Sequence, residues 1–323
     1  MNNNRISHVS SAISALALVI FICGVSMLSF ADDNEETDTA AAAKPEGIVF
    51  KGGLPVVWPP SGDPRPYAES PYAQQIDKGL AHLLYGKPPG DQWSRLMLLD
   101  FFQRKFGLHQ RYALVTTYAP YLRDSYGEDS GNHAFNRLFD PQHTLTLEEI
   151  EAAQDVERPL LRALFCDKHP LADAFFDEIN IIMESDVQFL HVLAGITYIF
   201  LRDNGCAARD ERIARLRDLS AARLRRLAML DTPNMGLKFN AVALLYGMGF
   251  SNLIEEDWIK DIAGAQNEDG GWPSHVFAAG DAGSDGAATA HALWVLLEHA
   301  LPDAPKTAWV PLHKSDDDTE GGS

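Results

Sequence analysis

The sequence predicts an all-α protein assembled from helical hairpins. From Ala73 onward, apolar residues recur at helical spacing, and no segment shows a convincing alternating pattern of a half-buried strand. Strongly apolar helices are predicted to start near Asp186, Asn234 and Asp285, about 50 residues apart, with a more polar helix between neighbours. This period is typical of stacked hairpins, because a single hairpin cannot bury its apolar face alone.

The N-terminus has the pattern of an export signal. A short polar leader carrying Arg5 precedes an apolar run over residues 12–30, and Ser29-Phe30-Ala31 fits a small-x-small cleavage site. We expect residues 1–31 to be a signal peptide and the mature protein to be periplasmic or secreted. The alternative is a membrane anchor over residues 12–30, because this run is just long enough to cross a bilayer.

Composition limits the partners. The chain carries 27 Lys and Arg against 45 Asp and Glu, a net charge of −18 at pH 7. Nucleic acids and anionic lipids are bound through Lys and Arg, so no nucleic-acid partner is expected, and membrane contact is expected only through an uncleaved N-terminal segment. Residues 32–72 are predicted to be an acidic and Pro-rich linker or arm, and residues 313–323 a disordered acidic tail.

Between these ends, residues 73–312 are predicted to form one helical domain. Gly86, Gly107 and Gly205 mark helix ends, and Thr146 with Glu149 has the spacing of a capping box. In order along the chain, helices are expected at 73–86, 91–106 and 109–123, as two short helices within 143–166, and at 171–183, 186–202, 208–230, 235–248, 252–266 and 286–301.

The most distinctive stretch joins the last two predicted helices and reads Gln266-Asn267-Glu268-Asp269-Gly270-Gly271-Trp272-Pro273. Its glycines permit a positive φ, Trp272 offers a large face to bury, and Pro273 prevents the helix from continuing. The stretch resembles the QW repeat of the squalene cyclase and prenyltransferase superfamily, whose core is Gln, two to five residues, Gly, any residue and Trp. The resemblance covers residues 235–301. It implies a reduced or incomplete α/α toroid, with the apolar helices inside and the Arg-rich helix 208–230 outside.

The catalytic motifs of that superfamily are not matched. Its class II cyclases protonate the substrate with an Asp-rich motif, whereas the run of aspartates here, Asp316 to Asp318, lies in the polar tail. Its prenyltransferase β subunits hold zinc with Asp, Cys and His. Asp285 and His291 lie near the corresponding helix start, but no cysteine stands in the matching context. A catalytic zinc needs at least three protein ligands, so no metal and no cofactor is expected.

Two cysteines remain after the predicted signal, Cys166 and Cys206. In an exported protein a disulfide between them is permitted, but two cysteines do not make a framework, and the sequence leaves both the bonded and the free state open.

A central cavity would be lined by the polar and aromatic members of the apolar helices and of the Gly-rich loop 274–285. These residues are His191, Tyr198, Asn240, His275, Asp285, His291 and Trp294. Each of them also has a purely structural interpretation, as a hydrogen-bonded core residue or a helix cap.

Three functions remain open. The favoured one is an exported binding or scaffold protein that lacks recognisable catalytic motifs and takes a hydrophobic small molecule, a lipid or a protein partner. The second is a cyclase-like enzyme acting on an isoprenoid or another lipid, which an aromatic-lined interior would suit. The third is a carbohydrate-active lyase or hydrolase, for which acidic residues are abundant.

Overall fold

The computed structural model describes residues 62–86, 92–112, 133–138, 140–208, 210–232, 234–275 and 283–310. Throughout these residues the regular structure is helical, without a β-strand, and one isolated bridge pairs Trp272 with Asp285. The predicted all-α class is therefore confirmed. The expected signal peptide, most of the N-terminal arm and the acidic tail lie outside the described residues.

The observed helices follow the predicted order. They are α2 (Ala73–Tyr85), α3 (Gln92–Phe106), η1 (Gln110–Tyr112), η2 (His133–Leu138), α5 (Leu147–Ala152), α6 (Arg158–Leu164), α7 (Asp173–Glu184), α8 (Gln188–Asp203), α9 (Glu211–Met229), α10 (Met235–Gly247), η3 (Ser251–Leu253), α11 (Glu256–Gly264) and α12 (Gly286–Ala300). None of the described helices is long and apolar enough to span a membrane.

Two predicted helices differ from the structure. Only η1 of the helix expected at 109–123 lies within the described residues. The helix expected at 252–266 is divided into η3 and α11, because Ile254 and Glu255 between them have extended backbone. The capping box is confirmed, since Thr146 accepts a hydrogen bond from the backbone of Glu149 while the Glu149 carboxylate accepts one from the backbone of Thr146.

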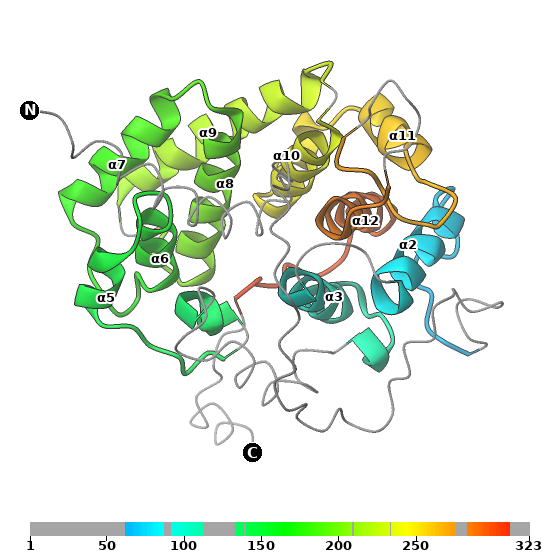
Figure 1. Cartoon of the computed structure of the whole chain (residues 1–323), viewed down its shortest axis with the longest axis horizontal. Coiled ribbons are helices and arrows are strands. Elements are labelled where there is room, and N and C mark those ends of the chain that lie inside the picture. Colours follow the sequence, from blue (N-terminus) through cyan, green and yellow to red (C-terminus); the bar gives the residue numbers. More distant parts are fainter. Residues whose placement is uncertain are drawn as a thin grey trace, which may run out of the picture.

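The helices form an inner row and an outer set. Along the inner row, α6 contacts α8, α8 contacts α10, α10 contacts α12, and α12 contacts α3. The helices α7, α9, α11 and α2 lie against this row from outside (Figure 1). Helices α8, α10 and α12 are largely apolar and bury most of their residues, whereas α9 buries one face and exposes most of its arginines. The apolar helices are thus buried and the Arg-rich helix lies at the surface, while the toroid arrangement stays a prediction.

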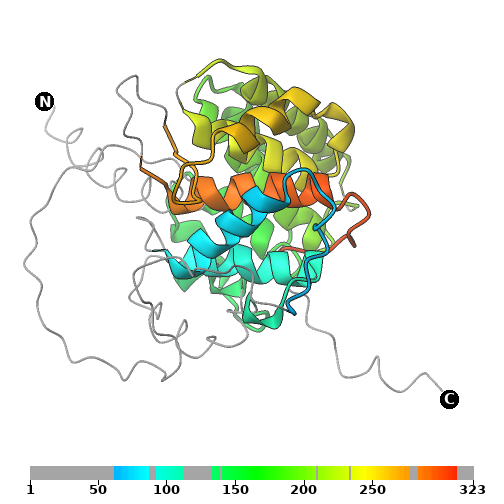
Figure 2. The same ribbon diagram turned by 90° about the vertical axis from the view of Figure 1, so that its right-hand side faces the viewer.

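The last hairpin packs against the first, so distant ends of the chain meet. Helix α12 contacts both α2 and α3, and Figure 2 shows α2 in front, between α12 and α3. Gly79 of α2 makes this contact possible, because a β-carbon there would lie 2.7 Å from the Trp272 ring and 2.8 Å from Leu293. The side-chain amide of Gln266 adds a hydrogen bond of 2.9 Å to the carbonyl of Gln75.

A C-terminal strap, residues 303–310, closes the end of the inner row where α3, α8 and α12 finish. The Trp309 ring lies 5.6 Å from Trp294, 6.0 Å from Phe200 and 6.4 Å from Phe101, measured between ring centroids. The Trp309 backbone N–H donates to the buried carboxylate of Asp203 at 2.7 Å. The strap therefore fills the space between these helix ends with the chain's own side chain.

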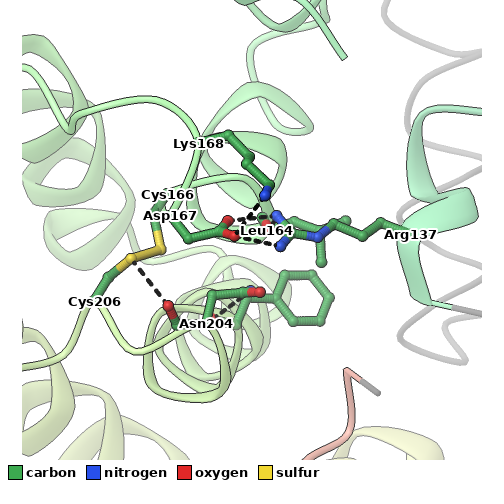
Figure 3. The surroundings of a disulfide bond; sticks show 8 residues. Arg137, Leu164, Cys166, Asp167, Lys168, Asn204 and Cys206 are labelled. Atoms are coloured by element: carbon green, nitrogen blue, oxygen red, sulfur yellow. Dashed lines mark hydrogen bonds and ion pairs between the residues drawn. A yellow bond between two sulfur atoms is a disulfide. The ribbon is translucent and has the colours of Figure 1, made fainter. Parts of the chain in front are cut away.

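Cys166 and Cys206 form a disulfide, which settles the question that the sequence left open. The bond joins the segments that follow α6 and α8, as Figure 3 shows. Next to Cys166, the Asp167 carboxylate receives two hydrogen bonds from the Arg137 guanidinium, at 2.6 and 2.7 Å. The disulfide and this ion pair together fix η2 and α6 against the C-terminal end of α8.

We predict that the disulfide contributes about 4 kcal/mol to the free energy of unfolding, because it closes a long loop in the unfolded chain. The Cys166→Ala, Cys206→Ala double variant should lose about this amount in urea denaturation. Wild-type protein in a reducing agent should lose a similar amount, and no loss in either measurement would contradict the assignment.

We predict that Gly79→Ala lowers the free energy of unfolding by about 1–3 kcal/mol, because the new methyl group would overlap Trp272 and Leu293. The matched control is Gly264→Ala, since a β-carbon at this helical glycine meets no atom within 4 Å. The control should be neutral or more stable by up to about 1 kcal/mol. Equal effects of the two substitutions would show that the contact between the first and last hairpins is not tight.

Candidate functional site

The two sequence-predicted residues on α8 have local partners. His191 is buried, and its Nε2 donates a hydrogen bond of 2.9 Å to the carbonyl of Ser185, which ties the start of α8 to the turn before it. Burial lowers the pKa of His191, and the nearby Arg223 lowers it further. Tyr198 is also buried and interacts with Arg217 of α9.

The predicted residues on α10 and α12 are deeper in the core. Asn240 is fully buried in α10. His291 donates from Nδ1 to the carbonyl of Ala287 one turn earlier, at 2.8 Å, and its burial lowers the pKa to about 4. Trp294 donates from Nε1 to the Glu298 carboxylate at 2.8 Å. Its ring packs edge-on to Trp309, so it contributes to the packing that closes the inner row.

Asp285 and His275 lie at the opposite end of the inner row from Trp309. Asp285 caps α12, because its side chain accepts a hydrogen bond of 2.8 Å from the backbone of Ala288. His275 lies beside the start of α10, where the preceding Ser274 carbonyl accepts a hydrogen bond from Gly236. The structure thus distributes the seven predicted residues over both ends and the interior of the row, and their role in lining one cavity stays a prediction.

At the end that carries Asp285, the structure brings together a cluster that sequence analysis missed: His82, Asp269 and Ser284. His82 lies in the last turn of α2, Asp269 lies in the turn before Trp272, and Ser284 directly precedes Asp285, the N-cap of α12. Ser284 Oγ donates to the Asp269 carboxylate at 2.6 Å, and the side-chain amide of Asn267 donates to Ser284 Oγ at 3.0 Å.

The two ring nitrogens of His82 have different surroundings. Nδ1 lies 3.2 Å from the Asp269 carbonyl and 3.7 Å from its carboxylate, so this nitrogen carries the proton and donates it. Nε2 is then the basic nitrogen, and it is buried without a hydrogen-bond partner. Buried polar atoms are usually paired, but Trp309 Nε1 at the other end of the row also lacks a hydrogen-bond partner. The His82 nitrogen differs from it in being a basic acceptor beside a carboxylate and a hydroxyl.

Gly271 separates His82 from Ser284. A β-carbon on Gly271 would lie 2.5 Å from Ser284 Oγ and 2.8 Å from His82 Nε2, so the two atoms are no farther apart than the sum of these distances. Any larger residue at position 271 would displace one of them. The second glycine of the motif therefore has a role at this cluster in addition to its role in the turn.

Helical spacing carried little signal for His82. It stands three residues after Gly79, beside the apolar stripe of Ile76, Leu80 and Leu83 and not within it. Its partners could not be found in this way, because Asp269 is 187 residues away along the chain. Among the described residues, no group of three or more His, Cys, Asp or Glu side chains could hold a metal ion.

A separate pocket of about 310 Å³ lies beside the disulfide. Its lining includes Cys166, Cys206, Asp167 and Lys168. Asp167 is already paired with Arg137, whose guanidinium holds the pKa of that carboxyl below its usual range although burial opposes this. The pocket has no comparable unpartnered group and is not the candidate site.

No family model matches the sequence, and no curated protein and no solved structure matches the chain. The resemblance to the squalene cyclase and prenyltransferase superfamily therefore rests on the stretch from Gln266 to Pro273 and stays a prediction.

We predict that His291 makes the protein less stable in acid. Its pKa is about 4 in the folded protein and near 6.5 when unfolded, so the unfolded state binds the proton first as the pH falls. Stability contributed by neutral His291 is complete above pH 6.5 and is lost progressively down to pH 4, by about 3 kcal/mol.

Urea denaturation between pH 7.5 and pH 4 checks this prediction. The wild type should lose more stability over that interval than His291→Gln, because glutamine does not titrate. Parallel curves for the two proteins would show that His291 is not kept neutral by burial.

Proposed function

We propose that this chain is an exported binding protein whose ligand reaches the end of the inner row formed by His82, Asp269 and Ser284. The observation that carries the proposal is His82, a buried imidazole with one nitrogen held by the Asp269 carbonyl and the other without a partner. Such a nitrogen is a preorganised acceptor for an O–H or N–H group, because its lone pair is fixed in direction and its ring is more than nine-tenths buried.

The two ends of the inner row differ in a way that supports this choice. At one end, the strap places Trp309 between the helix ends. The Trp309 backbone N–H donates to Asp203, and the Arg104 guanidinium donates to the backbone carbonyls of Ala308 and Trp309. At the other end, two turns carry polar groups around Gly271, next to the start of α12. The aromatic interior that a cyclase-like enzyme would use for a cation is occupied by Trp309 in this structure.

Export is part of the proposal. The disulfide between Cys166 and Cys206 suits an oxidising compartment, because cytosolic thiols are normally kept reduced. The signal pattern of residues 1–31 points to the periplasm or the outside of the cell. The ligand we propose is a hydrophobic small molecule or lipid that carries a polar group, since the helices beneath the cluster are apolar. A protein partner is the alternative.

Native mass spectrometry of the mature protein, purified from its own host, tests this function. We expect a retained small molecule in the wild type and its loss from His82→Gln, which removes the imidazole. The control is His299→Gln, because His299 lies at the other end of α12 and pairs with Glu256 instead. Retention of the same molecule by His82→Gln would contradict the site, and an empty wild type would favour the scaffold alternative.

A further inference from the structure

We infer that the cluster of His82, Asp269 and Ser284 is a nucleophilic site for carboxylic esters, with Ser284 as the residue that accepts the acyl group. The inference rests on the proposed function, because it assigns chemistry to the same site. Its basis is the arrangement of the three side chains. Asp269 lies next to Nδ1 of the His82 imidazole, and the Ser284 hydroxyl lies on the side of Nε2. This arrangement is what activation of a serine requires.

Asp269 determines which nitrogen of His82 can act as a base. Its carbonyl lies 3.2 Å from Nδ1 and its carboxylate 3.7 Å from the same atom, so the proton is held on Nδ1. The carboxylate also stabilises the imidazolium that forms when Nε2 takes a second proton. The lone pair of Nε2 has no other hydrogen-bond partner, so the imidazole itself is free to accept the serine proton.

Ser284 lies within reach of that lone pair. In the structure its hydroxyl donates to the Asp269 carboxylate at 2.6 Å, which is a resting position. Both Ser284 Oγ and His82 Nε2 lie against Gly271, and activation requires the hydroxyl to leave Asp269 and turn toward the imidazole. Catalytic hydrogen bonds often tighten only when substrate is bound.

The reaction balances with water as the second substrate. Ser284 Oγ attacks the ester carbonyl carbon, its proton passes to His82 Nε2, and the bond between the acyl carbon and the alcohol oxygen breaks. The alcohol leaves with the proton from Nε2. Water then attacks the acyl-serine, giving its proton to Nε2, and the carboxylic acid leaves while Ser284 Oγ recovers that proton.

Two groups are placed to stabilise the oxyanion of this reaction. The side-chain amide of Asn267 lies 3.0 Å from Ser284 Oγ, so it is close to any carbonyl bonded to that oxygen. Ser284 also lies one residue before the cap of α12, a helix of 15 residues whose N-terminal dipole favours negative charge.

Labelling with diisopropyl fluorophosphate tests the inference on the full folded protein. The reagent forms a bond between Oγ and phosphorus while fluoride leaves and the proton passes to His82. We expect one adduct by intact-protein mass spectrometry, mapped to Ser284 by peptide analysis, and none on Ser284→Ala. The labelling rate of His82→Gln should be lower than that of the wild type by a factor of at least about 100, because this variant lacks the base.

Ser251→Ala is the matched control, since Ser251 is an exposed serine outside the cluster and its loss should leave the labelling rate unchanged. Thermal melting of each variant establishes that it is folded. The inference is overturned if the folded wild type is not labelled, if Ser284→Ala is labelled equally, or if His82→Gln reacts at the wild-type rate. A retained ligand together with an unlabelled Ser284 would overturn this inference and leave the proposed function standing.

Discussion

The contact between the Trp272 turn and α2 is the constraint on which the arrangement of the helices depends. Trp272 is completely buried, its indole N–H donates to the carbonyl of Ile262, and its backbone N–H donates to the hydroxyl of Thr289. The same ring lies against Gly79, which has no side chain to keep it away. One tryptophan therefore joins α2, α11 and α12, and the first hairpin is held against the last although about 190 residues separate Gly79 from Trp272.

This constraint also positions the candidate site. The turn that presents Trp272 must pass over the end of α2, and it carries Asp269 to His82 and Gly271 between His82 and Ser284. The close packing of Gly271 leaves room for the imidazole and the hydroxyl side by side. A structural turn and a polar cluster thus share the same few residues, which explains why the stretch beginning at Gln266 is the most distinctive part of the sequence.

The opposite end of the inner row has a different chemistry. There the charged groups are buried in pairs, with Lys105 2.7 Å from Glu298, and the strap carries Trp309 into an aromatic cluster. Buried charges are tolerated only when they are paired and hydrogen-bonded, and Glu298 meets this requirement through both Lys105 and Trp294. We interpret this end as closed packing and the His82 end as the proposed ligand-binding end.

The sequence by itself determined most of the helices, because each depends on local spacing, capping and proline or glycine at its ends, although η2 was not predicted and the helix expected at 252–266 is divided. The apolar all-round pattern of α8, α10 and α12 also identified the inner row, since such helices must be buried on every side. Only the tertiary structure decided which polar side chains meet. His191 and His291 were expected at a cavity but bond to backbone carbonyls within six residues, whereas His82 meets partners 187 and more residues away. Helical periodicity places a residue on a face of its own helix, but the partner of that face is fixed by long-range packing.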